Sequence, residues 1–369
     1  MRTIRRLIYG EVLASVGYVT LGFLALFFFF DFVDELQSIG KNSLGGTYQV
    51  RHALLYVALR VPTHWYELLP IAVLIGTIFV MARLAQSSEY TILRTSGLGP
   101  WRALNTLLGL GAMFVVLTFA VGDYLAPLSE RTAQIVKARF EGRLSIGQTG
   151  AWLKEKLPDG SYAANISALS PDGGMRGVRV FEFDNDGFMR AVTQADSARF
   201  GQDNAWNMTG VSRSEFARPT SERANVVRRK LDSYRLPTAI NAEMVSVALL
   251  KPDRMSTVDL FQYIQHLETN GQTAQRYEIE FWRKVFYPLS CLVMVVLALP
   301  FAYLHFRSGG ITAYVFGGVM IGISFFLLNN VFGYIGNLRN WEPWLAAASP
   351  GLLYMLMSLG AFGWLVLRR

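Results

Sequence analysis

The chain has 369 residues, of which 52% are hydrophobic and only 17% are charged, and its formal net charge is +8. Soluble domains usually contain about 25% charged residues, so the composition favours a membrane protein. The 25 Phe, 16 Tyr and 8 Trp exclude a disordered chain, and the single Cys excludes a disulfide framework or a cysteine-rich metal site.

Five uncharged apolar runs are long enough to cross a bilayer, which needs about 20 residues per helix. They are residues 12–30, 103–122, 285–304, 309–338 and 343–367. The run at 68–82 is shorter, but Trp65 and Pro70 can belong to the outer end of a longer helix that begins near Arg51. We therefore predict six spans. The first run is too long for a cleaved signal peptide, and no cleavage site of the A-x-A type follows it.

Residues 126–255, between the third and fourth spans, have the pattern of an all-β domain. Apolar and polar residues alternate at 178–183, 192–200 and 205–211, and the residues Asn185-Asp186-Gly187 mark a turn. Short alternating strands with such turns predict an antiparallel sandwich or jelly roll.

Two helices then lead back to the membrane. Ser256 and Asp259 form a capping box that opens the first helix, which ends near Gly271. The second helix runs from about Thr273 through Trp282 into the fourth span. The chain thus divides into an N-terminal transmembrane half, a β domain, and connecting helices with a C-terminal transmembrane half. The boundaries we expect are 1–125, 126–255 and 256–369.

Orientation follows from the Lys and Arg of the short loops. With the N-terminus inside, the cytoplasmic segments contain Arg2, Arg5, Arg6, Arg83, Arg94, Arg102, Arg307, Arg368 and Arg369. The short outer loops contain only Lys41, Arg51, Arg60 and Arg339. We therefore expect both termini and the 83–102 loop in the cytoplasm, and the β domain on the other side. The net positive charge is mostly an orientation signal, and we expect no nucleic-acid partner because no basic stripe with interleaved aromatic residues remains.

The predicted fold class is an α-helical membrane protein with six transmembrane helices and an inserted periplasmic all-β, jellyroll-like domain. The sequence contains no G-x-x-x-x-G-K-[ST] loop, no H-E-x-x-H and no G-x-S-x-G motif, so it favours neither a nucleotide site nor a hydrolase. Cys291 lies within a span and is interpreted as a packing residue. We expect no catalytic residue, no metal site and no cofactor, which favours a transport subunit.

The loop between spans two and three predicts a short capped helix, at about 87–97. Ser88 can cap it, Glu89 lies at the positive end of the helix dipole, and Arg94 near the other end. Gly97 can adopt the left-handed conformation after the helix. Such a helix is either a well-capped connector or a coupling helix that docks into a motor ATPase.

The same loop carries a resemblance to a known family. Residues 81–89, reading Met-Ala-Arg-Leu-Ala-Gln-Ser-Ser-Glu, and the pair Ser96-Gly97 resemble the LptF/LptG permeases of lipopolysaccharide export. Residues 32–36 and 271–277, with Trp282 and Lys284 following, resemble the LptG branch of that family. The likeness covers the whole chain, and the order of three spans, an outer β domain and three more spans agrees with it.

The resemblance implies a half-transporter of the Gram-negative inner membrane that extracts lipopolysaccharide. It implies an LptF-like permease partner and two copies of an LptB-like ATPase, which would bind the ATP and Mg. It also implies LptC-like and LptA-like proteins that form a periplasmic bridge with the β domain.

The resemblance and the residue pattern together suggest three groups of site residues. The ATPase-coupling candidates are Glu89, Tyr90 and Arg94. The candidates for the lipid cavity or lateral gate, on spans one and five, are Phe27, Phe30, Phe316 and Ile323. The candidates for binding lipid phosphate near the outer membrane surface are Lys41, Arg51, Arg60, Arg131 and Lys137. The chain departs from the family pattern at Asp31 and Thr63, where members often carry basic residues.

Other functions remain open at this point. The chain could be an LptF-type paralogue, or a mechanotransmitting or assembly protein that does not itself conduct lipid. A secondary transporter would need acids buried within spans, whereas Glu67 and Asp123 lie near span ends. An intramembrane enzyme is not favoured, because no paired acids or Ser/His set share one membrane depth.

Overall fold

The computed structural model describes residues 2–40, 42–43, 46–141, 150–169, 174–201, 204–217, 226–241, 244–245, 248, 251–303 and 311–367. The chain folds into two compact units. The first, which we call the helical unit, comprises Met1–Asp34, Val57–Ser129 and Glu278–Arg369. The second, which we call the β unit, comprises Glu35–Tyr56 and Glu130–Tyr277.

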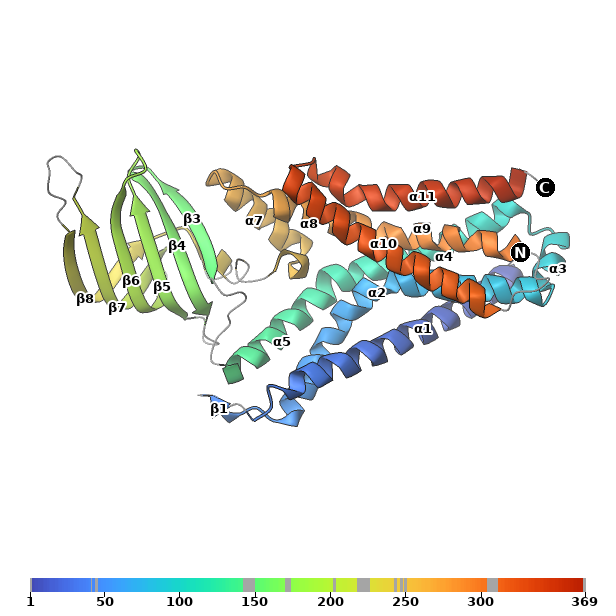
Figure 1. The fold of residues 1–369 in the computed structure, drawn as a ribbon, viewed down its shortest axis with the longest axis horizontal. Coiled ribbons are helices and arrows are strands. Elements are labelled where there is room, and N and C mark those ends of the chain that lie inside the picture. Colours follow the sequence, from blue (N-terminus) through green and yellow to red (C-terminus); the bar gives the residue numbers. More distant parts are fainter. Residues whose placement is uncertain are drawn as a thin grey trace. The chain divides into compact units, whose positions relative to one another are not determined.

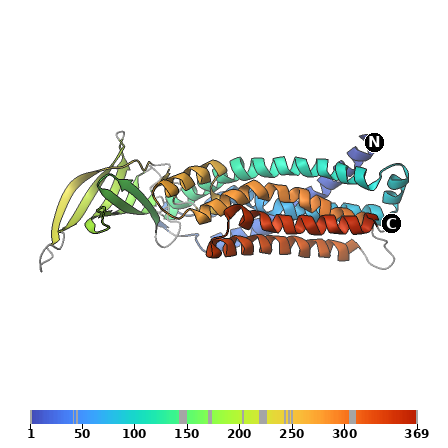
Figure 2. The ribbon, with the colours of Figure 1, turned by 90° about the horizontal axis from the view of Figure 1, so that it is seen from above.

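Within the described residues, six helical segments are long and apolar enough to cross a membrane, which confirms the predicted number of spans. In the helical unit the long helices run side by side (Figures 1 and 2). The N-terminal spans are formed by α1 (Arg2–Leu36), α2 (Val50–Gln86) and α4 (Pro100–Ala120), the last continued by a π turn (Val121–Leu125) into α5 (Ala126–Glu141). The C-terminal spans are formed by α8 (Gln275–Phe286) with α9 (Ser290–Ala298), by α10 (Ile311–Arg339) and by α11 (Pro343–Leu367).

The length of the second span explains why only part of it appears as an apolar run in the sequence. The helix α2 is 37 residues long and contains Pro62 and Pro70, so the run at 68–82 belongs to a longer helix, as predicted. Ala72, Val73 and Leu74 are fully buried, which places α2 in the middle of the helical unit. A helix buried on all sides needs no polar face, and its sequence therefore shows little amphipathic pattern.

Glycine allows two neighbours to approach α2 closely. A Cβ atom at Gly76 would lie 2.8 Å from the backbone nitrogen of Val16 on α1. Gly318 and Gly322 of α10 lie against Ile78 and Ile71 of α2. Because glycine leaves room for close contact, α1 and α10 both pack tightly on α2.

The β unit contains one six-stranded antiparallel sheet, whose strands pair in sequence order as a curved meander (Figure 1). The strands are β3 (Ala151–Leu157), β4 (Gly160–Leu169), β5 (Met175–Phe183), β6 (Met189–Phe200), β7 (Ala205–Phe216) and β8 (Val226–Pro237). The residues Asn42–Ser43 (β1) and Gly46–Thr47 (β2) form a separate hairpin. The predicted strands and the inserted all-β domain are confirmed. The predicted turn at residues 185–187 is closed by the side chain of Asp184, which accepts hydrogen bonds from the backbone N–H groups of Asp186 and Phe188.

The segment after β8 ties distant strands together. Trp206 of β7 donates its indole N–H to the carbonyl of Ile240 at 2.9 Å. Glu155 of β3 accepts hydrogen bonds from the side chain of Thr238 at 2.7 Å and the backbone of Ala239 at 3.0 Å. Residues 238–241 therefore form a strap that joins β7 to the edge strand β3.

The helix α7 (Thr257–Thr269) opens with the predicted capping box, in which Ser256 and Asp259 each satisfy a backbone N–H of the other. Its last residue is Thr269, and Gly271, two residues further on, has a φ of 63°. The side chain of Asn270, at the end of α7, accepts from the backbone N–H of Lys156 at 2.9 Å and fixes the helix to β3.

Candidate functional site

The predicted loop helix exists as α3 (Glu89–Thr95), but Ser88 does not cap it. Ser88 has a φ of 61° and its side chain makes no capping hydrogen bond, so this part of the prediction was wrong. The other end agrees with the prediction. Gly97 has a φ of 97° and donates to the carbonyl of Arg94, while Leu98 donates to the carbonyl of Leu93. This is a Schellman motif, which requires a left-handed residue at its turn.

One side of α3 anchors it and the opposite side is free. Tyr90 is buried, and its ring centroid lies 5.2 Å from that of Tyr303 in an edge-to-face arrangement. Burial raises the pKa of Tyr90, so the residue is a neutral anchor. Glu89 and Arg94 are exposed, and Ile92 is 62% exposed. The candidates Glu89 and Arg94 thus share an outward surface with Ile92, which our sequence analysis did not single out.

The apolar candidates for a lipid cavity all lie on the outside of the helical unit. Phe27 and Phe30 of α1 are exposed, as are Phe316 and Ile323 of α10. The ring of Phe27 also lies 5.2 Å from that of His64 on α2. Because these four side chains are exposed, lipid or another chain can contact them.

The unusual acid of span one has partners on span two. Oδ2 of Asp31 lies 3.0 Å from Nη1 of Arg60 and 2.7 Å from Nε2 of His64. Nδ1 of His64 in turn lies 3.9 Å from Glu67. Arg60, a candidate for phosphate binding, is therefore ion-paired with a carboxylate of α1.

Two further basic candidates are held in the same way, within the β unit. Lys137 of α5 lies 3.1 Å from Glu35, a residue that is only 5% exposed, and its ammonium lies over the ring of Tyr56. Arg131 of α5 pairs with Asp259. Burial opposes ionisation of Asp259, but hydrogen bonds from Ser256 and Arg131 outweigh it and lower the pKa of that carboxyl.

The remaining two candidates differ. Arg51 is exposed near the start of α2, and Lys41 lies outside the described residues. The paired candidates are distributed over both units: Arg60 belongs to the helical unit, Arg131 and Lys137 to the β unit. What they have in common is a carboxylate within ion-pair distance, with which any bound anion would have to compete.

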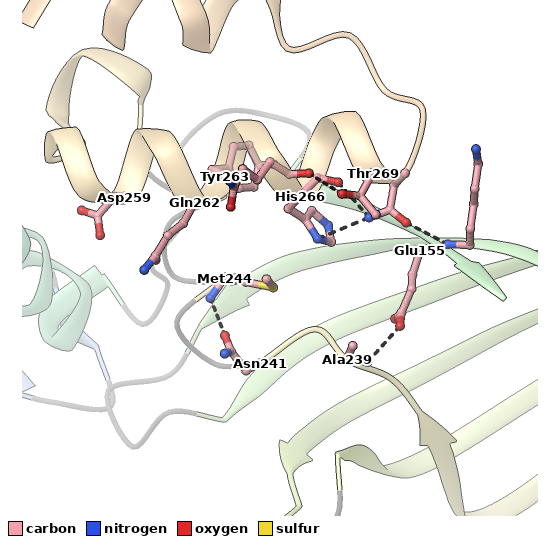
Figure 3. Close-up of a pocket in the computed structure, with 12 residues that line it drawn as sticks. Glu155, Ala239, Asn241, Met244, Asp259, Gln262, Tyr263, His266 and Thr269 are labelled. Carbon is pink, nitrogen blue, oxygen red and sulfur yellow. Dashed lines mark hydrogen bonds between the residues drawn. The ribbon is translucent and has the colours of Figure 1, made fainter.

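A cavity of about 570 Å³ in the β unit was not anticipated (Figure 3). It lies between α7 and the strap that follows β8, beside Glu155 of β3. The α7 residues that line it are Asp259, Gln262, Tyr263, Gln265, His266, Thr269 and Asn270. Most of these are three or four residues apart and so share one face of the helix. This spacing of polar residues was a signal that sequence reasoning could have used.

His266 is one of the titratable residues that line this cavity from α7. Its Nδ1 lies 3.3 Å from the amide nitrogen of Asn270, and burial lowers its pKa. The cavity is also lined by the charged residues Glu155, Lys156 and Asp259 and by the amides of Gln262 and Gln265. Within the part of the chain that the structure describes, no group of three or more His, Cys, Asp or Glu could hold a metal ion.

Comparison with known proteins agrees with this arrangement. Residues 6–368 match the family described as "Lipopolysaccharide export system permease LptF/LptG". The chain is 28% identical over 341 residues to the lipopolysaccharide export system permease protein LptG of Escherichia coli (strain K12), covering 92% of this chain and 90% of that protein. It is 25% identical over 372 residues to LptG of Haemophilus influenzae, covering 100% and 99% of the two chains. The chain therefore belongs to the LptF/LptG family of lipopolysaccharide export permeases.

Proposed function

We propose that this chain is the LptG-type permease subunit of an ABC transporter that extracts lipopolysaccharide from the inner membrane and passes it to a periplasmic bridge. The observation that carries the proposal is the anchored helix α3, which presents Glu89, Ile92 and Arg94 outward in a chain that has no nucleotide-binding loop of its own. A permease without a motor needs a surface on which a separate ATPase can act.

The mechanical coupling follows from how α3 is held. Tyr90 and Leu98 are buried in the helical unit, so a force applied to the exposed side of α3 moves the spans α2 and α4 to which the helix is joined. The carboxylate of Glu89 pairs with a basic residue of an LptB-like ATPase. The transporter contains two copies of this ATPase, which bind ATP and Mg. The termini and α3 lie in the cytoplasm in this proposal, and the β unit in the periplasm.

Lipid transport needs both an apolar surface and cationic groups. Exposing an acyl chain to water costs about 0.8 kcal/mol per methylene, so a lipid with several chains has to be shielded throughout its path. Phe27, Phe30, Phe316 and Ile323 supply apolar surface on α1 and α10, in a cavity shared with an LptF-like permease. Arg60, Arg131 and Lys137 supply positive charge for the lipid phosphates, in exchange with the carboxylates that hold them.

The β unit continues the path. Among the described strands, β8 pairs only with β7, so we propose that the other edge of β8 serves for strand addition. The fully buried side chains of Val180 and Met208 give the sheet an apolar face. An LptC-like and an LptA-like protein would extend this sheet into a bridge.

Association with the ATPase tests the proposal. We expect Glu89→Ala to weaken co-purification of the LptB-like ATPase with the complex by about tenfold, since a charge-assisted contact contributes about 1.5–3 kcal/mol. Thr91→Ala, at an exposed neighbouring position of α3, is the matched control and should leave co-purification unchanged. Equal amounts of ATPase with Glu89→Ala and with the unaltered chain would contradict the proposed docking surface.

A further inference from the structure

A second cavity lies inside the helical unit, and none of the candidate residues above lines it. It has a volume of about 200 Å³ and is lined by α8 and α9, α10 and α11. Its walls are almost entirely apolar, with Val293 on α9, Phe325 on α10 and Met355 on α11. We call it the outer-helix crevice. Leu352 and Met355 at its side are about half exposed, so the crevice opens to the surface that faces the membrane or a neighbouring chain.

Asn329 is one of the polar residues that line this largely apolar space. Asn329 of α10 lines the crevice and is only 7% exposed. Its amide makes no hydrogen bond to any other residue that the structure describes. Because Asn329 lines the crevice, its amide can donate a hydrogen bond to a ligand there. An apolar ligand with a carbonyl oxygen at this depth would accept that hydrogen bond.

Arg283 lines the crevice and is ion-paired with Glu280, which lies beside the crevice and is not part of its lining. Nη1 of Arg283 lies 2.7 Å from Oε1 of Glu280, and Nη2 of Arg283 donates to Asn330 at 3.0 Å. Both charged side chains of this pair are about one-fifth exposed. A guanidinium next to a carboxylate complements a ligand that carries a phosphate next to an ammonium group, whereas a purely anionic headgroup would be repelled by Glu280.

We propose that the outer-helix crevice binds one acyl chain of a zwitterionic glycerophospholipid from the surrounding membrane. An ester carbonyl of the lipid accepts from the Asn329 amide, and the phosphate and ammonium lie beside Arg283 and Glu280. A volume of about 200 Å³ is below the 300–1,000 Å³ of pockets that enclose a whole small molecule, so it suits part of a single chain. The lipid is a resident of the membrane, and the proposal does not depend on lipopolysaccharide transport.

A glycine in the wall provides a test that does not disturb the fold. Gly351 of α11 lines the crevice, and a Cβ there would meet nothing within 4 Å. Gly351→Phe therefore fills the crevice instead of clashing with its wall. Gly360→Phe is the matched control, because a Cβ at Gly360 on the same helix also meets nothing within 4 Å, and Gly360 does not line the crevice.

The probe is phosphatidylethanolamine with a diazirine on one acyl chain, added to membranes that contain the full chain with its partner subunits. Peptides of α10 and α11 are then examined for adducts by mass spectrometry. We expect labelling of the crevice residues, a loss of about tenfold in Gly351→Phe because several methylenes are displaced, and no change in Gly360→Phe. Unchanged labelling in Gly351→Phe, or equal losses in the two variants, would overturn the proposal.

Two further arms test the polar contacts. Asn329→Leu should reduce labelling about fivefold, since one hydrogen bond is lost, without lowering the thermal stability of the detergent-solubilised chain. Phosphatidylglycerol with the same diazirine chain should label about fivefold less than phosphatidylethanolamine. Equal labelling by the two lipids would overturn the zwitterionic assignment, and adducts only from co-purified lipopolysaccharide would show that the crevice belongs to the transport path instead.

Discussion

Oδ2 of Asp31 on α1 lies 3.0 Å from Nη1 of Arg60 on α2, so this acid is ion-paired across two spans. His64 contacts the same carboxylate oxygen at 2.7 Å. Both side chains of the Asp31–Arg60 pair are less than one-quarter exposed. The carboxylate of Asp31 on span one thus has two basic side chains of span two as partners.

Removing this carboxylate should loosen the contact between α1 and α2. We expect Asp31→Asn to destabilise the helical unit by about 1–3 kcal/mol, because Arg60 is left partly buried without its charge partner. The control is Glu11→Gln, which breaks the more exposed pair of Glu11 with Arg83 between the same two helices and should cost at most about 1 kcal/mol. Thermal unfolding in detergent measures both; equal effects would contradict a special role of Asp31.

Close packing at Gly76 gives a second prediction. The Cβ of Gly76→Ala would lie 2.7–2.9 Å from the backbone and side chain of Val16, and neither helix can move there without disturbing its neighbours. We expect a loss of about 1–3 kcal/mol in stability, as for other overpacked cores. Gly22→Ala, whose Cβ meets nothing within 4 Å, should not lower the unfolding temperature. A stable Gly76→Ala variant would show that α1 does not lie against α2 at this point.

The pair Arg131–Asp259 makes the start of α7 sensitive to acid. The pKa of Asp259 is lowered in the folded chain, so its stabilising effect is present above the ordinary carboxyl pKa and is lost as the pH falls through the folded value, below about pH 4. We expect hydrogen exchange of the α7 amides, corrected for intrinsic rates, to accelerate in that range. Asp259→Asn should remove this acid step, whereas Asp253→Asn, at an exposed position, should retain it. The same acid step in Asp259→Asn would exclude the pair as its cause.

The anchor of α3 gives a prediction that separates anchoring from docking. Tyr90→Ala removes the ring that contacts Tyr303 and should uncouple lipid-stimulated ATP hydrolysis while the basal rate of the ATPase remains. Tyr90→Phe keeps the ring, and since no hydroxyl contact is needed for anchoring, it should behave as the unaltered chain. Stimulation by lipid in Tyr90→Ala at the normal level would mean that α3 transmits force without this anchor.

The spans, the strands and the capping box of α7 could be predicted because each depends on local pattern. Apolar length, alternation and the pair Ser256–Asp259 are all contained within short stretches of sequence. Ser88 shows where local pattern fails: a serine before a helix caps it only if the incoming backbone is extended, and α2 ends here in a turn that gives Ser88 a positive φ.

The contacts of the candidate sites could not be predicted, since they join residues far apart in the chain. Asp31 and Arg60 meet only because α1 and α2 pack in a particular register, and Lys137 meets Glu35 across 102 positions. Ile92 was overlooked because an isoleucine suggests burial, whereas α3 buries Tyr90 instead. Both cavities likewise depend on how distant helices and strands are placed.

The central claim is that lipopolysaccharide itself passes along this chain, in contrast to a mechanotransmitting or assembly role. Diazirine side chains of similar volume, introduced at Phe27 on α1 and at Met208 on the buried face of β7, test it directly. With the assembled transporter in proteoliposomes, we predict lipopolysaccharide adducts at Phe27 and, only during ATP hydrolysis, at Met208. No lipopolysaccharide adduct at either position during ATP turnover would contradict the account.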